Sequence, residues 1–116
     1  SLLARTGNLK GLLLNQRFVA GIGNWIADEV LFQAGIAPNR RANSLSSSEV
    51  KRLFSSIKEA IRTAVQLNAN KKRFPNHWIF HHRWGKVAGA KTNEGDSIEF
   101  ARIGGRTTAW VPTRQH

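Results

Sequence analysis

Apolar residues recur at the spacing of an α-helix in three stretches of the first part of the chain. The first stretch lies between Leu9 and Gln16, and the second runs from Asn24 to Ala34. In the second, apolar residues fall at positions i, i+1, i+4, i+5 and i+8: Ile26, Ala27, Val30, Leu31 and Ala34. A stripe of this width predicts a helix that packs one face against a core.

The third stretch predicts the longest helix. Ser46 and Glu49 have the spacing of a capping box, which places the helix start at Ser46, and we expect it to end near Leu67. Its expected apolar face consists of Val50, Leu53, Phe54, Ile57, Ile61, Ala64 and Val65. Its charged residues lie off that face, which favours a solvated role for most of them.

The segment before the second helix has the composition of a tight turn. Gly21 and Gly23 flank an isoleucine, and Asn24 follows as a favourable N-cap. The unpaired N–H groups at a helix start bind anions, so the turn predicts a clamp for a backbone phosphate. A corner whose glycines serve only close packing fits the same residues. Asp28 and Glu29, in the early part of the helix, are interpreted as a solvated face that the helix dipole favours rather than as catalytic residues.

The last third of the chain changes in character after a polar hinge at Asn68–Arg73. Three β-type runs are expected there, at His77–Trp84, Ser97–Ile103 and Thr107–Val111. Gly104 and Gly105 would form the tip of a hairpin between the last two runs. We therefore predict an α+β protein, with a mainly helical domain over 1–70 and a small antiparallel β-hairpin domain over 71–116.

The hairpin tip carries a candidate binding group. Arg106 follows Gly105, and the hydroxyl of Thr107 comes next. The planar guanidinium matches a phosphate with two parallel hydrogen bonds, and a rigid hairpin can carry it into a groove. An ordinary solvated turn residue fits this segment equally well.

The charge balance favours a polyanionic partner. The chain has 18 Lys and Arg against 7 Asp and Glu, for a formal net charge of +11. Such an excess attracts nucleic acid, and no apolar run approaches the ~20 residues that a membrane span needs. The absence of cysteine excludes disulfides and thiolate ligands. We expect a soluble, intracellular, nucleic-acid-binding protein, and the start at Ser1 without a methionine favours a piece of a longer chain.

Two motifs resemble a known family. The segment 18–38, FVAGIGNWIADEVLFQAGIAP, closely resembles the helix–two-turn–helix signature of the formamidopyrimidine-DNA glycosylase and endonuclease VIII family. The segment 104–115, GGRTTAWVPTRQ, looks like the C-terminal finger hairpin of that family. The motifs occur in the family's order, and the resemblance covers nearly the whole chain.

The resemblance implies a role in base-excision repair. Members remove oxidised purines such as 8-oxoguanine and formamidopyrimidine from duplex DNA and then cleave the abasic strand. It implies that Asn24 binds the backbone near the lesion, with Gly21 and Gly23 in the turn. It also implies that Arg106, with Gly105 and Thr107, holds phosphates that flank the extruded nucleotide. A cytoplasmic location would follow in a bacterium and a nuclear one in a eukaryote.

The finger departs from most members of the family. Four cysteines there bind one zinc ion, and the aligned positions are His81, Trp84, Val111 and Arg114. That set cannot build a tetrahedral thiolate site, so the resemblance implies a zincless finger, and we expect no metal or other cofactor. The neighbouring His77, His81 and His82 are expected to stack or to form hydrogen bonds.

The catalytic groups implied by the family lie in a preceding N-terminal domain, which would be the partner of this segment. They are an N-terminal proline amine and a neighbouring glutamate, and Ser1 cannot replace a secondary amine. We therefore expect this segment, as a monomer, to bind DNA but neither to excise bases nor to cleave strands.

Two other classes of protein share part of the pattern. A helix–hairpin–helix module has a similar Gly-x-Gly turn, and a ribosomal RNA-binding protein with a helix–two-turn–helix has a Gly-Ile-Gly turn and an equally basic charge. Neither accounts for the aromatic second half with its Gly-Gly-Arg-Thr-Thr hairpin.

Overall fold

A computed structural model of the 116-residue chain describes residues 9–14, 24–68, 70–103 and 105–116. Three α-helices are described: α1 (Leu9–Leu14), α3 (Asn24–Ala34) and α4 (Ser47–Gln66). The helix predicted from Asn24 to Ala34 has those bounds. The glycine turn that contains Gly21 and Gly23 lies outside the described residues.

The start of α4 confirms the capping box. The Ser46 hydroxyl accepts a hydrogen bond from the backbone N–H of Glu49 at 3.2 Å, and the Glu49 carboxylate accepts one from the N–H of Ser46 at 2.9 Å. Arg40 donates to both carboxylate oxygens of Glu49, at 2.9 and 3.0 Å. This pair lowers the pKa of Glu49 to about 2, chiefly through the hydrogen bond from Arg40.

The predicted apolar face of α4 is wrong at two positions. Phe54 and Val65 are 53% and 68% exposed, whereas Leu53, Ala60 and Ala64 are buried. The helix packs on α3 along a narrow stripe in which small alanines allow close approach. The expected face was wider than this contact, so its edges remain in solvent.

The C-terminal hairpin is confirmed. Strand β1 (Glu99–Ile103) pairs antiparallel with β2 (Arg106–Trp110), and Ile103 lies opposite Arg106 next to the turn. Gly105 has a φ of +79°, in the left-handed region that glycine adopts without strain.

The β-type run expected at His77–Trp84 is wrong. This segment forms two 3₁₀ helices, η4 (Ile79–His82) and η5 (Trp84–Lys86), and two further 3₁₀ turns lie at η2 (Ala42–Ser44) and η3 (Lys71–Arg73). The backbone N–H groups of Ile79 and Phe80 donate to the Glu29 carboxylate at 3.3 and 2.8 Å. Because these donors are used by a side chain of α3, they do not form a strand ladder.

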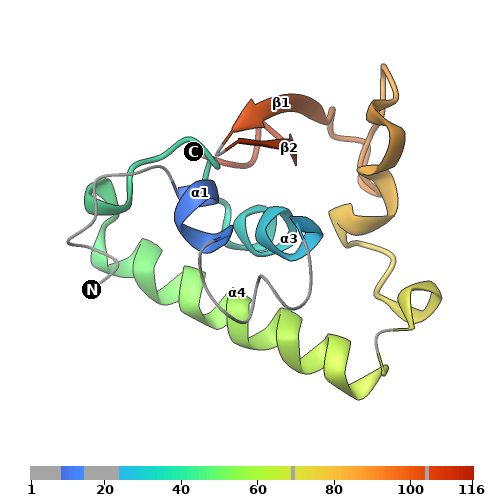
Figure 1. The fold of residues 1–116 in the computed structure, drawn as a ribbon, viewed down its shortest axis with the longest axis horizontal. Coiled ribbons are helices and arrows are strands. Elements are labelled where there is room, and N and C mark those ends of the chain that lie inside the picture. The colour runs from blue at the N-terminus through green and yellow to red at the C-terminus, as the bar shows by residue number, and fades with distance from the viewer. Residues whose placement is uncertain (1–8, 15–23, 69, 104) are drawn as a thin grey trace.

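The described chain is mainly helical with one two-stranded hairpin, as predicted. In Figure 1, α4 runs along one side of α1 and α3, the hairpin lies on the other side, and η3, η4 and η5 lie at one end. A large core joins the helices to the aromatic residues Phe74, Trp78 and Phe80. A smaller core under the hairpin consists of Ile79, Ile98, Ala109 and Val111. The helices and the segment 71–86, called the finger segment below, therefore share buried surface.

No helix among the described residues has the length and apolar character needed to span a membrane.

Candidate nucleic-acid interface

The structure brings the start of α3 and the hairpin tip together. Asn24, Gly105, Arg106 and Thr107 line one surface pocket of about 400 Å³, together with Arg102. The Nδ2 atom of Asn24 donates a hydrogen bond to the backbone oxygen of Thr107 at 3.0 Å. Four of the six residues predicted to bind DNA therefore lie at one place, and the other two, Gly21 and Gly23, lie outside the described residues.

The Asn24 side chain is used across the fold. Its Nδ2 holds the hairpin, and its Oδ1 is buried without a hydrogen-bond partner among the described residues. The expected capping bond to its own helix is therefore absent from the described contacts. A buried acceptor without a partner is locally unfavourable.

The pocket contains a second arginine that was not selected from the sequence. Arg102 lies on β1 opposite Thr107, and Ile103 lies opposite Arg106. Both Arg102 and Arg106 are exposed and line the pocket. The tight turn between the strands could have identified Arg102, because it fixes which residue of β1 faces Thr107. Two guanidinium groups on one ribbon form a strongly cationic concavity.

A buried charged network holds the hairpin against the helices. Lys10 of α1 is fully buried, and its ammonium forms an ion pair with Asp28 of α3. It also donates to the Thr108 hydroxyl at 2.9 Å and to the Thr107 carbonyl at 3.5 Å. Asp28 in turn accepts hydrogen bonds from the Arg83 guanidinium, at 2.7 and 3.1 Å, and from the N–H of Ala109, at 3.2 Å.

This network corrects the interpretation of Asp28 as a solvated residue. Asp28 is 1% exposed, and its partners come from α1, β2 and the finger segment. Burial lowers the pKa of Lys10, whereas the nearby Asp28 carboxylate opposes that change. A helical apolar stripe shows which face is buried but not which polar residue finds distant partners, so Lys10 was missed. The network fixes Thr107, whose carbonyl also binds Asn24.

Glu29 is also buried, contrary to expectation. The Glu29 carboxylate accepts hydrogen bonds from the N–H groups of Ile79 and Phe80 and from the side-chain amide of Gln33, the last at 3.0 Å. Burial raises the pKa of Glu29 to about 7, although these three donors oppose the change. Asp28 and Glu29, at adjacent positions of one helix, thus bind the finger segment at Arg83 and at the start of η4.

The four positions aligned with zinc ligands are used in other ways. The His81 ring nitrogen bonds the carbonyl of Phe74 at 3.0 Å, and Val111 is buried in the smaller core. The Trp84 ring lies 5.3 Å from Phe80 and 4.7 Å from the Arg83 guanidinium, and Arg114 pairs with Asp96 at 2.6 Å. Trp84 and Val111 have no atom that can bind a metal ion, and Arg114 is a cation. These residues therefore do not fit a zinc ion.

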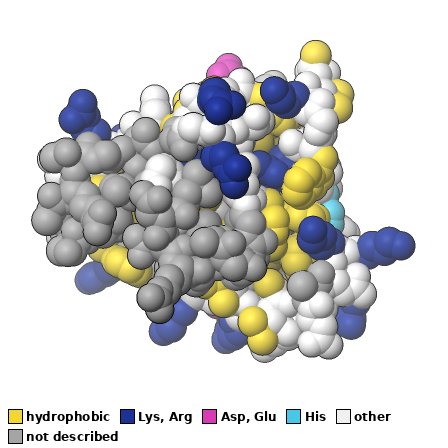
Figure 2. All heavy atoms as spheres, in the orientation of Figure 1, with side chains coloured by type: hydrophobic (Ala, Val, Ile, Leu, Met, Phe, Trp, Pro, Cys, Tyr) yellow, Lys and Arg dark blue, Asp and Glu magenta, His cyan; other side chains and the backbone are white. Residues whose placement is uncertain are grey.

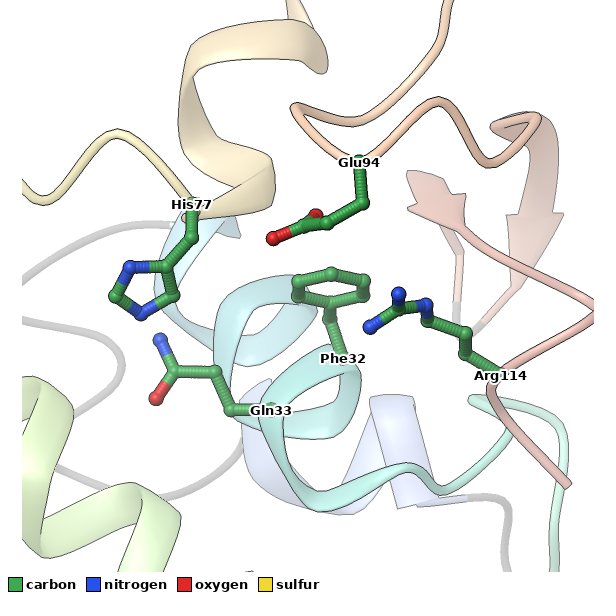
Figure 3. A pocket seen from close by; sticks show the side chains of 5 residues that line it. All are labelled: Phe32, Gln33, His77, Glu94 and Arg114. Carbon is green, nitrogen blue, oxygen red and sulfur yellow. The ribbon is translucent and has the colours of Figure 1, made fainter.

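A second pocket, of about 290 Å³, lies toward the other end of α3. Phe32 and Gln33 of that helix line it with His77, Glu94 and Arg114. Figure 3 shows the Glu94 carboxylate and the Arg114 guanidinium on either side of the Phe32 ring, with His77 next to Gln33. None of the residues predicted to bind DNA lines this pocket.

Positive charge is spread widely over the visible face of the protein. Figure 2 shows Lys and Arg side chains around the rim, and on one side they alternate with hydrophobic side chains. Two of these cations, Arg102 and Arg106, line the pocket that contains Asn24.

Comparison with known proteins identifies similar sequences and folds. The family model of the formamidopyrimidine-DNA glycosylase H2TH domain matches residues 1–76, and that of the formamidopyrimidine-DNA glycosylase-like C-terminal domain matches residues 78–112. A formamidopyrimidine-DNA glycosylase of Arabidopsis thaliana is 49% identical over 115 residues, which are 99% of this chain and 29% of that protein.

Solved structures agree with these matches. The Lactococcus lactis formamidopyrimidine-DNA glycosylase bound non-covalently to DNA with an abasic site superposes with a TM-score of 0.81 at 34% identity, over 99% of this chain and 43% of that one. MutM in complex with DNA that contains carbocyclic 8-oxo-G gives a TM-score of 0.80 at 33% identity, over 99% and 43% of the two chains. The chain thus spans less than half the length of these relatives.

Proposed function

The chain belongs to the formamidopyrimidine-DNA glycosylase family, and from this premise we propose that it is the part of a base-excision-repair glycosylase that grips the DNA backbone beside the damaged base. The complete protein would remove oxidised purines, such as 8-oxoguanine and formamidopyrimidine, and cleave the abasic strand. This segment would supply binding, and a catalytic N-terminal domain would supply the chemistry.

The observation that supports the proposal most directly is the shared pocket of Asn24 and Arg106. Its two arginines offer planar forks for phosphate oxygens, and its asparagine is fixed by a hydrogen bond to Thr107. A phosphate at this place would be bound by groups from a helix start and a hairpin at once. Because both elements are attached to the buried Lys10–Asp28 network, the grip would be preorganised.

A rigid grip suits an enzyme that acts on a single base. Such an enzyme must extrude its target nucleotide from the stack, at the expense of a few kcal/mol of unstacking. Phosphate contacts on either side of the extruded nucleotide position the strand without reading its sequence. The two relatives named above whose structures contain DNA were solved with an abasic site and with an 8-oxo-G analogue, which fits this use of the site.

The experiment measures the affinity of the chain for three labelled ligands at one salt concentration. They are a duplex with a central abasic-site analogue, the undamaged duplex, and a structured RNA of equal charge. We expect one chain to bind each duplex and both duplexes to bind more tightly than the RNA. Preferential binding of the RNA would instead favour the ribosomal type of helix–two-turn–helix protein. Incubation with an 8-oxoguanine duplex should yield neither free base nor cleaved strand.

A further inference from the structure

A second cationic surface lies outside the Asn24–Arg106 pocket. From Thr63 to Asn93 the sequence contains no Asp or Glu. Its basic residues are Lys71, Lys72, Arg73, Arg83, Lys86 and Lys91. Arg83 is buried on Asp28, but η3 and η5 leave most of the others in solvent. Because this segment has no acidic side chains, it contains no charge that repels the phosphates of a nucleic-acid backbone.

Exposed aromatic surface lies within this segment. The Trp84 side chain is 50% exposed although its ring contacts Phe80 and the Arg83 guanidinium. Lys71 lies over the same Phe80 ring, with its Nζ 6.0 Å from the ring centre. A single buried ring, Phe80, therefore carries an exposed tryptophan and an exposed lysine. The exposed basic side chains around this ring attract the phosphates of a nucleic-acid backbone.

The surface is attached to the same end of α3 as the phosphate pocket. Trp25 follows Asn24 in the first turn of that helix, and its ring lies 5.0 Å from Phe80 and 5.3 Å from Phe74. The buried Phe80 ring, on which Trp84 and Lys71 pack, therefore contacts the helix turn that carries Asn24. The acidic residues of α3 that pack here, Asp28 and Glu29, are buried and already bonded, so they do not oppose a polyanion at the surface.

We propose that Lys71, Lys72, Arg73, His81, Trp84 and Lys86 form a second contact surface for the backbone of the same duplex, away from the damaged base. This inference rests on the proposed function, because it extends the footprint of DNA held at Asn24 and Arg106. Duplex DNA carries one charge per ~1.7 Å of axis, so a longer duplex presents further phosphates to these side chains. The surface adds affinity that depends on the length of the DNA.

The test compares two labelled duplexes with the same central abasic-site analogue. One ends within a few base pairs of the site, and the other extends about one helical turn, ~10 bp, further on each side. The variant K71Q/K72Q/R73Q removes three exposed charges of the surface. The matched control, K51Q/K58Q/R62Q, removes three exposed charges from α4. Thermal unfolding verifies that each variant is folded.

The surface variant should bind the long duplex about tenfold more weakly and the short duplex nearly as well as the wild type. Its salt slope on the long duplex should become shallower by about 2.7, at ~0.9 for each lost phosphate contact. The control should bind both duplexes like the wild type. Equal binding of the long duplex by the surface variant and the wild type would overturn the inference, as would an equal loss with the control.

Two further outcomes separate this inference from the proposed function. Arg106→Ala should weaken binding of both duplexes, and if it does so while the surface variant is unaffected, only the second surface is refuted. If Arg106→Ala has no effect on either duplex, the proposed function itself fails. If single-stranded DNA of the same length as the long duplex binds as tightly as that duplex, the assignment to duplex DNA is also overturned.

Discussion

The side-chain amide of Asn24 donates a hydrogen bond to the backbone carbonyl of Thr107 at 3.0 Å. This bond joins the first residue of α3 to a strand 83 positions further along the chain. The next residue before Thr107 is Arg106, at the exposed end of the same strand. Two residues that the sequence places in separate motifs are thereby held in one pocket. Any loss of this link should loosen the arginine as well as the asparagine.

Loss of the Lys10 ammonium should destabilise the fold strongly. The variant Lys10→Met leaves buried Asp28 with only Arg83 and the N–H of Ala109 among its described partners. Breaking a buried ion pair costs about 3–5 kcal/mol, so the free energy of unfolding should fall by that amount in denaturant titration. Lys58→Met, on the exposed face of α4, serves as the control and should change it by less than ~0.5 kcal/mol. Equal stability of the two variants would show that Lys10 is dispensable.

Stability should depend on the ionisation of Glu29. Its pKa is raised to about 7 by burial, from an ordinary value of 4.5. Between these values the unfolded chain releases the proton first, so the native state binds more protons and the free energy of unfolding falls as the pH rises. A change of this size corresponds to about 3 kcal/mol, completed as the pH passes about 7.

Glu29→Gln removes this titration. Thermal unfolding from pH 5 to pH 8 should therefore show a wild-type midpoint that declines relative to that of Glu29→Gln. Glu59→Gln, at an exposed carboxylate of α4, should run parallel to the wild type. A constant difference between the wild type and Glu29→Gln across this range would contradict the assignment.

Binding should weaken steeply with salt. If the pocket binds backbone phosphates, as proposed, the logarithm of the affinity should fall linearly with the logarithm of the salt concentration, with a slope of about −0.9 per phosphate contacted. Fluorescence anisotropy at several potassium chloride concentrations measures the slope. An affinity that is insensitive to salt would indicate that the charged pocket is not the contact.

Chelation should leave the fold unchanged. Trp84 and Val111 lack an atom that can bind a metal ion, and His81 and Arg114 already have protein partners. The thermal midpoint should therefore be the same with and without EDTA, and added zinc should not raise it. A drop in the midpoint on addition of EDTA would reveal a metal site that these residues do not explain.

Elements with strong local signals were predictable from the sequence. The Ser46–Glu49 capping box, the helix from Asn24 to Ala34 and the glycine-tipped hairpin each depend on residues close together in the chain. The fold class followed from their order. The resemblance assigned both Asn24 and Arg106 to phosphates near the lesion, and the structure brings the two residues into one pocket.

Features that depend on distant partners were not predictable. The acidic residues Asp28 and Glu29 have the sequence of a solvated helix start, yet both are buried because Lys10, Arg83 and backbone donors of η4 satisfy them. The hydrogen bonds from the N–H groups of Ile79 and Phe80 to Glu29 also explain why the segment 77–84 is not a strand. Charge and periodicity alone do not reveal which buried carboxylate meets which distant donor.

The most direct test of the central account is the affinity of Asn24→Ala, Arg106→Ala and the double variant for a duplex with an abasic-site analogue. Arg62→Ala, an exposed arginine on α4, is the control of equal charge for Arg106→Ala. If both residues grip one strand, each single variant should bind about tenfold or more weakly, and the loss in the double variant should be smaller than the sum of the single losses. The Arg62 variant should remain within about twofold of the wild type. Wild-type affinity in both single variants, with the fold intact, would contradict the account.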